Sequence, residues 1–216
     1  MRTYQELFRT PEFTPLFLAS AGQVAAQTVS GLALGTLVFT TTGSPLLSAL
    51  AMFGPSLAQV IGATMLLSAA DRLPPRATLA ALSLLFALGM AAAALPGLPV
   101  PAVLGIVLGL GVFSALGGGV RLGLLNEILT KEGYLLGRST INMSSGLMQI
   151  GGYATGGLLV AVLSPRGALL TGAALYLVAA ALARGGRPRV AGRPPPPPGG
   201  GAQRRGRTRA RGGAPP

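Results

Sequence analysis

The chain carries few side chains that could do chemistry, and their types exclude most kinds of enzyme. It has no Cys and no His among 216 residues, and only five residues are acidic. Thiolate and imidazole metal sites, disulfides, and catalytic pairs of Ser or Cys with His are therefore excluded. The acidic residues are Glu6, Glu12, Asp71, Glu127 and Glu132. Because they are spread along the chain, no carboxylate cluster is available for a hard divalent cation. We expect neither an enzyme nor a cofactor.

Four polar residues recur every three to four positions near the N-terminus: Ser20, Gln23, Gln27 and Ser30. This spacing puts them on one face of a helix. A polar stripe on a helix that crosses lipid turns towards other helices or a water-filled cavity. The stripe either lines a cavity and hydrogen-bonds a substrate, or makes contacts between helices worth ~0.6 kcal/mol each. Weaker candidates for the same role are Gln59, Asn142 and Gln149.

Arg121 and Glu127 form a possible charged site, because Arg121 lies in or at the end of an apolar run with Glu127 six residues later. As a charge within the membrane, the arginine could bind an anionic substrate or take part in gating. The alternative is an arginine that snorkels to the cytoplasmic end of its helix. The nearby Asn126 and Glu127 favour this second interpretation.

The elements that must position these residues are long apolar runs. Half of the residues are hydrophobic and 10% are charged, where a globular domain usually has about 25% charged residues. The runs cover about 14–40, 45–70, 77–95, 101–125, 140–163 and 168–183, and the longest polar connection is 126–138. A crossing helix needs ~20 residues. Leu, Ala and Gly dominate, and lipid offers no partner to backbone groups, so we expect helices and not barrel strands.

The sequence therefore predicts an all-α fold, a polytopic transmembrane bundle of six spans within residues 1–184. The basic residues of the lead-in, of the connections after the second and fourth spans, and of the tail would all share one side of the membrane. Arg166 would lie alone on the other side. This distribution predicts a multi-pass protein of the cell membrane with both termini in the cytoplasm.

Residues 185–216 consist almost entirely of Pro, Gly, Arg and Ala, and we expect a disordered cytoplasmic tail. Nine of the 17 basic residues lie between Arg184 and Arg211, so the net charge of +12 belongs mainly to this tail. One interpretation is a polybasic segment on anionic lipid, worth about 1 kcal/mol per basic residue. The interpretation that we favour is an out-of-frame translation of GC-rich DNA. No specific nucleic-acid partner is expected.

The turn between the second and third spans carries Asp71, Arg72 and Arg76. With this turn, six spans and an uncharged first turn, the chain resembles the N-terminal half of a major facilitator superfamily transporter. That family's turn is similar to Gly-x-x-x-Asp-Arg-x-Gly-Arg-Arg. This chain departs from the pattern at Leu67, Pro74 and Pro75. The resemblance implies that the turn is a gating latch; the alternative is an ordinary turn whose ion pairs contribute ~0 to 1 kcal/mol.

The fifth span resembles the Gly-x-x-x-Gly-Pro-x-x-Gly-Gly pattern of family exporters at Gly152, Gly156 and Gly157, and departs from it at Met148 and Tyr153. Glycines at this spacing also let helices pack closely, which we expect to be their main role. The resemblance further implies that the six spans form two inverted three-helix units.

We therefore expect secondary active transport of an unknown small molecule through the lipid bilayer, by alternating access and in the export direction. A complete family member has six further spans, so we expect a half-transporter that requires a second six-helix half or another copy. The alternative is a non-transporting integral membrane protein whose polybasic tail binds anionic lipid or an acidic partner.

Overall fold

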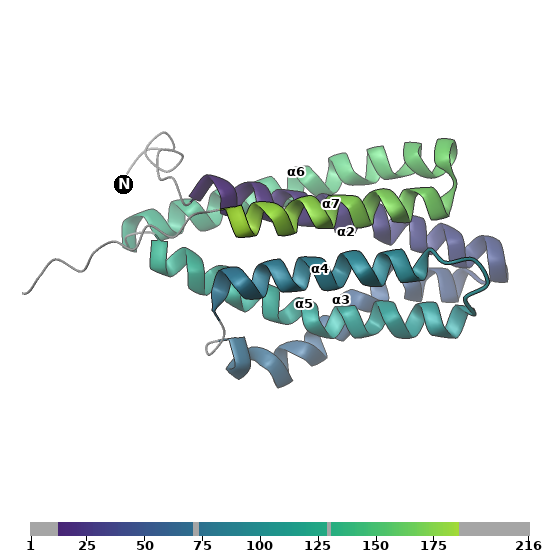
Figure 1. Cartoon of the computed structure of the whole chain (residues 1–216), viewed down its shortest axis with the longest axis horizontal. Coiled ribbons are helices and arrows are strands. Elements are labelled where there is room, and N and C mark those ends of the chain that lie inside the picture. The colour runs from purple at the N-terminus through teal and green to yellow at the C-terminus, as the bar shows by residue number, and fades with distance from the viewer. Residues whose placement is uncertain (1–12, 71–73, 129–130, 186–216) are drawn as a thin grey trace, which may run out of the picture.

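The computed structural model describes residues 13–70, 74–128 and 131–185, without the side chains of 66–70, 127–128, 131–133 and 185 (Figure 1). In these ranges the chain forms six helices and no strand. They are α2 (Phe13–Thr42), α3 (Pro45–Ala70), α4 (Pro75–Ala93), α5 (Val100–Ile128), α6 (Lys131–Leu163) and α7 (Pro165–Gly185). All six are long and apolar enough to cross a membrane. The prediction of an all-α bundle of six spans is confirmed. The predicted tail beyond 185 lies outside the described residues.

One predicted boundary was wrong. The polar stretch 126–138 was expected to be a connection, but α5 extends to Ile128 and α6 begins at Lys131. The stretch contains no proline, and Leu, Glu and Lys have good helix propensity, so polarity alone does not interrupt the helix. A run of apolar residues marks the part of a helix that lies in lipid, not the whole helix.

The other helix boundaries follow from turn chemistry. Proline is the first residue of α3, α4 and α7, where its missing N–H needs no partner within the helix. Gly43 and Gly97 take positive φ values of 66° and 84° in the turns after α2 and α4. Ser164, between α6 and α7, has a φ of 88°, and its Oγ accepts a hydrogen bond from the N–H of Gly167 at 3.3 Å. These turns reverse the chain within a few residues.

The six helices pack in a pattern that nearly repeats when α2, α3 and α4 are exchanged with α5, α6 and α7. The contact of α3 with α5 corresponds to that of α6 with α2. The contact of α2 with α7 corresponds to that of α5 with α4, and the contact between α4 and α7 corresponds to itself. The repeat has two exceptions: α2 packs on α3 more extensively than α5 packs on α6, and α6 touches α7 while α3 and α4 barely meet. Successive spans run antiparallel, so the second three-helix unit is inverted relative to the first.

The closest helix crossing joins α3 to α5, near the middle of both helices. A Cβ atom added to Gly62 of α3 would overlap the carbonyl oxygen of Val112. One added to Gly111 of α5 would lie 2.5 Å from the carbonyl oxygen of Pro55. Both neighbours are backbone atoms that cannot rotate away. The absence of a side chain at these two positions therefore sets the distance between the helices.

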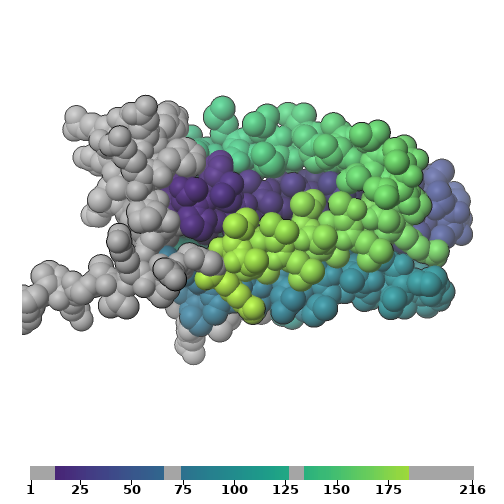
Figure 2. Space-filling view, turned by 45° about the horizontal axis from the view of Figure 1, so that its top comes forward, coloured from purple at the N-terminus to yellow at the C-terminus, as the bar shows by residue number. Residues whose placement is uncertain are grey.

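The helices α3 and α6 form opposite edges of the bundle (Figure 1). Figure 2 shows α7 between α6 and α4 on one face of the molecule. Only 11% of the α6 span is buried, against 50% of the α4 span. The outer faces of α6 must therefore meet lipid or another protein.

Candidate functional site

A polar cavity of about 110 Å³ lies at mid-height of the bundle. Four of its lining residues, Gln27, Phe86, Ser114 and Tyr176, are within two positions of the midpoints of α2, α4, α5 and α7. The remaining lining residues are Gln23, Val24, Gln59, Gly117, Gly118 and Arg121. Five helices contribute to the wall, so only the folded bundle creates this space.

The cavity adjoins a smaller space of about 40 Å³ on the α3 side. The two share Gln27, Phe86, Ser114 and Tyr176, and the smaller one continues between apolar residues such as Met52 and Val107. The rings of Phe86 and Tyr176 stack with their centroids 5.3 Å apart. The Oγ of Ser114 donates to the carbonyl of Gly111 at 2.6 Å, which satisfies the hydroxyl proton within its own helix.

Arg121 provides the charge of the cavity and ties α5 to α2. Its Nη2 donates a hydrogen bond to Oε1 of Gln23 at 2.5 Å. Its Nε is buried and has no hydrogen-bond partner among the described residues. Gln23 is ten residues into α2, ~15 Å along the axis. The favoured interpretation of Arg121 as a snorkelling residue is therefore wrong: the guanidinium turns inward to another helix because Gln23 offers an acceptor there.

A second, larger cavity of about 210 Å³ lies on the other side of Arg121, towards α6. Arg121 and Gly118 line both cavities. On the α6 side the wall contains the exposed residues Arg138 and Asn142, together with Ser145. Arg121 thus separates an inner polar cavity from an outer one that holds a second basic residue.

The predicted polar stripe divides into two groups. Gln23 and Gln27 line the inner cavity, as does Gln59 of α3. Ser20 and Ser30 are buried and line neither of the two cavities. Ser30 instead lies against α7, where a Cβ atom on Gly172 would overlap its Oγ. The glutamines are long enough to reach the cavity, and the short side chain of Ser30 allows α7 to pack closely.

The candidates on α6 have separate positions. Asn142 lines the outer cavity, while Gln149 is exposed on the same helix. Gly152 and Gly156 face α2: their added Cβ atoms would lie 2.9 Å from Cβ of Thr28 and 3.3 Å from Cα of Val29. Gly157 is exposed, and a Cβ atom added to it would lie 3.9 Å from Cδ2 of Leu32.

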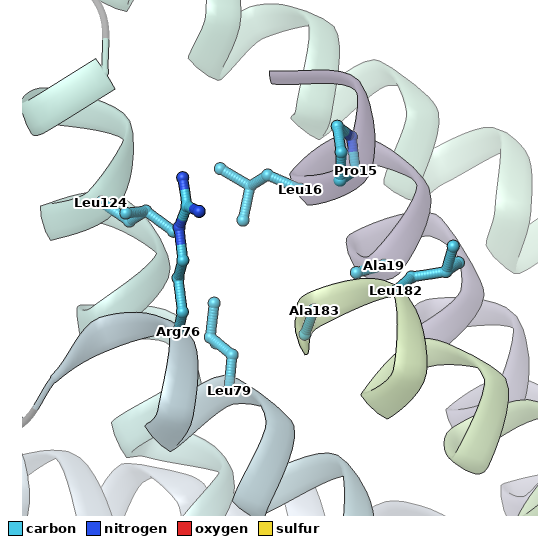
Figure 3. A pocket seen from close by; sticks show the side chains of 8 residues that line it. All are labelled: Pro15, Leu16, Ala19, Arg76, Leu79, Leu124, Leu182 and Ala183. Atoms are coloured by element: carbon cyan, nitrogen blue, oxygen red, sulfur yellow. The ribbon is translucent and has the colours of Figure 1, made fainter. Parts of the chain in front are cut away.

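The charged turn is described only in part. Asp71 and Arg72 lie outside the described residues, as does the side chain of Glu127. Arg76 lines a small cavity of about 20 Å³ at one end of the bundle. Figure 3 shows its side chain extending from the start of α4 alongside Leu124 of α5, with Leu16 of α2 facing it. Because Leu182 and Ala183 of α7 also line this cavity, Arg76 lies where four helices meet.

Sequence reasoning missed Phe86, Ser114 and Tyr176 as cavity residues. The only available signal was weak: Tyr176 is the one aromatic residue in the apolar run 168–183. Within the described ranges, no group of three or more Asp, Glu, Cys or His residues could hold a metal ion. What the cavity offers chemically is hydrogen bonding and one positive charge.

The six apolar helices make this chain a multi-pass membrane protein. No protein-family model, curated protein sequence or solved structure matches it.

Proposed function

We propose that the chain is a six-helix half of a transporter of the major facilitator type. It exports a small molecule by alternating access, and the mid-height cavity forms part of the transport path. The helix packing supports this proposal, because the contacts nearly repeat on exchange of two inverted three-helix units. Transporters built from such repeats bind their substrates near the bilayer midplane.

The observation that carries the proposal is the exposure of polar side chains at depths where lipid would be expected. Gln27 lies at the midpoint of α2 and is exposed. Asn142 and Gln149 are exposed on α6. Polar groups within a membrane face a protein interior or a water-filled cavity, because lipid cannot hydrogen-bond them. A second six-helix half, or another copy of this chain, supplies the missing wall and encloses water between the two.

This function predicts that the centre of α2 is in contact with water. The chain has no native Cys, so single cysteines report cleanly. In membrane vesicles, Gln27→Cys should react with a water-soluble methanethiosulfonate at least about tenfold faster than Leu177→Cys, because the reactive thiolate forms in water and not in lipid. Leu177 is a matched control, since it is 49% exposed and lies near the midpoint of α7. Equal and slow reaction at both positions would contradict the water-filled path.

Single-cysteine variants of the same chain also test the predicted orientation in the membrane. Among the described side chains, Arg76, Arg138 and Arg184 lie towards one end of the bundle and Arg166 towards the other. We therefore place the first end in the cytoplasm of a cell-membrane protein. In whole cells, an impermeant maleimide should label Pro96→Cys at once and Pro74→Cys only after permeabilisation. Both prolines are exposed in turns at opposite ends, so the reverse pattern would invert the topology.

Transport can be measured with a tandem fusion of two copies. An even number of spans returns the chain to the side where it began, so both copies insert in the same orientation. Vesicles containing the fusion should show saturable flux of at least one of three labelled probes: acetate, glucose and ethidium. In the fusion, Gln27→Leu in both copies should lower that flux at least about tenfold, equivalent to 1.4 kcal/mol. Flux that rises linearly with concentration for all three probes would count against transport.

A further inference from the structure

The environment of Arg121 is unusual for an arginine in a membrane span. An arginine within such a helix is costly unless it is paired or hydrated, by about 2.5–3.5 kcal/mol or more at the helix centre. Arg121 lies in the last third of α5. Here Gln23 accepts one hydrogen bond from Nη2, and Nε is buried without a described partner. A neutral amide oxygen satisfies one N–H and leaves the charge uncompensated.

The surrounding cavities add to the positive charge. Among the described residues that line the inner and outer cavities, none is acidic, and Arg138 adds a second positive charge on the outer side. The Oε1 of Gln23 accepts from Arg121, so the N–H₂ of the same amide is left as a pair of donors beside the guanidinium. Gln59 brings a further amide to the inner cavity. The site is therefore rich in donors and carries excess positive charge.

We propose that the Arg121 cavity binds a small oxyanion, a carboxylate being the simplest example. The anion accepts hydrogen bonds from the Nη groups of the Arg121 guanidinium and from the amide of Gln23, and it enters through the outer cavity past Arg138. A guanidinium edge presents parallel N–H groups that match the two oxygens of a carboxylate. The inner cavity of about 110 Å³ admits a molecule of a few heavy atoms. This inference rests on the proposed function, in which the cavity is part of the transport path.

The test measures the unfolding temperature of the full chain, purified in an uncharged detergent without lipid, by circular dichroism. Sodium acetate should raise this temperature saturably relative to sodium gluconate at equal ionic strength, because a ligand that binds the folded state stabilises it. Gluconate has the same charge and is a much larger anion than acetate. Neutral acetamide should give no shift. Lipid is absent, so the shift reports a free anion and not a headgroup.

Variants make the test specific to Arg121. The shift with acetate should disappear in Arg121→Gln and persist in Arg166→Gln, which removes the same charge at the far end of the bundle. Because Arg121→Gln could also impair folding, Gln23→Glu is the decisive variant. It puts a carboxylate where Nη2 already donates. It should unfold at a higher temperature in gluconate and lose the acetate shift. An unchanged acetate shift in Gln23→Glu, or its loss in Arg166→Gln, would overturn the proposal.

The binding site and the proposed function can fail separately. A shift with acetate that depends on Arg121, together with slow labelling of Gln27→Cys, would keep the anion site and reject the water-filled path. Rapid labelling of Gln27→Cys without a shift of the unfolding temperature in acetate would keep the water-filled path and reject the anion site.

Discussion

Replacing Gly62 by Ala should lower the free energy of unfolding by about 3 kcal/mol, at the upper end of the usual cost of overpacking. The added Cβ atom would overlap the carbonyl oxygen of Val112. A backbone oxygen cannot change rotamer, so α3 and α5 must move apart along their contact. The measurement is unfolding of the purified chain by titration with sodium dodecyl sulfate in mixed micelles, followed by circular dichroism. Gly111→Ala should behave similarly, because its Cβ would lie 2.5 Å from the carbonyl oxygen of Pro55.

Gly109 provides the matched control on the same helix as Gly111. In the described part of the chain, no heavy atom outside its own helix backbone lies within 4 Å of the position that its Cβ would occupy. Gly109→Ala should therefore be neutral or stabilising by up to ~1 kcal/mol, the difference in helix propensity between the two residues. If Gly109→Ala and Gly62→Ala lowered the free energy of unfolding equally, the close α3–α5 crossing would not be the cause of the destabilisation.

The second large effect concerns the pair formed by Arg121 and Gln23. Gln23→Leu removes the acceptor of Nη2 and leaves the guanidinium with no described partner, which should cost about 2–3 kcal/mol. Arg121→Leu removes the charge and its desolvation cost together. In the double variant the loss should be smaller than the sum of the two single losses, since replacing both partners by apolar groups leaves no polar group unsatisfied. The same detergent titration measures all three variants.

The result is a coupling free energy, obtained as the departure of the double variant from additivity. We expect about 1.5 kcal/mol, within the 0.5–3 kcal/mol typical of residues in contact. Effects that add within about 0.3–0.5 kcal/mol would show that the two residues act independently. Gln59→Leu is the control, since Gln59 lines the same cavity and should couple to Arg121 much less strongly.

The number and type of the elements could be predicted from the chain's composition. Lipid forces each apolar run of ~20 residues to satisfy its own backbone hydrogen bonds, and a helix is the only local way to do so. The helix starts at Pro45, Pro75 and Pro165 were also readable, because the fixed φ of proline suits the first turn of a helix. The extension of α6 back to Lys131 was missed, because hydropathy reports the lipid-embedded part of a helix alone.

The positions of the polar residues could be predicted only to the level of a helix face. The spacing of Gln23 and Gln27 put them on an inward face, but the distance to Arg121, 98 residues further along the chain, depends on how α2 and α5 pack. The same holds for the close approach at Gly62. Glycine spacing alone does not identify such contacts: Gly105 and Gly109 are four residues apart, like Gly152 and Gly156, yet neither has a close neighbour among the described residues.

Local sequence is therefore informative about which backbone state each segment adopts, since that state depends on lipid and on residues a few positions away. Contacts between spans depend on the rotation and register of whole helices, which are set by the sum of many weak packing terms across the bundle. Phe86, Ser114 and Tyr176 became cavity residues through that sum. Apart from the lone aromatic ring of Tyr176 in its apolar run, no pattern within their own helices marked them for the role.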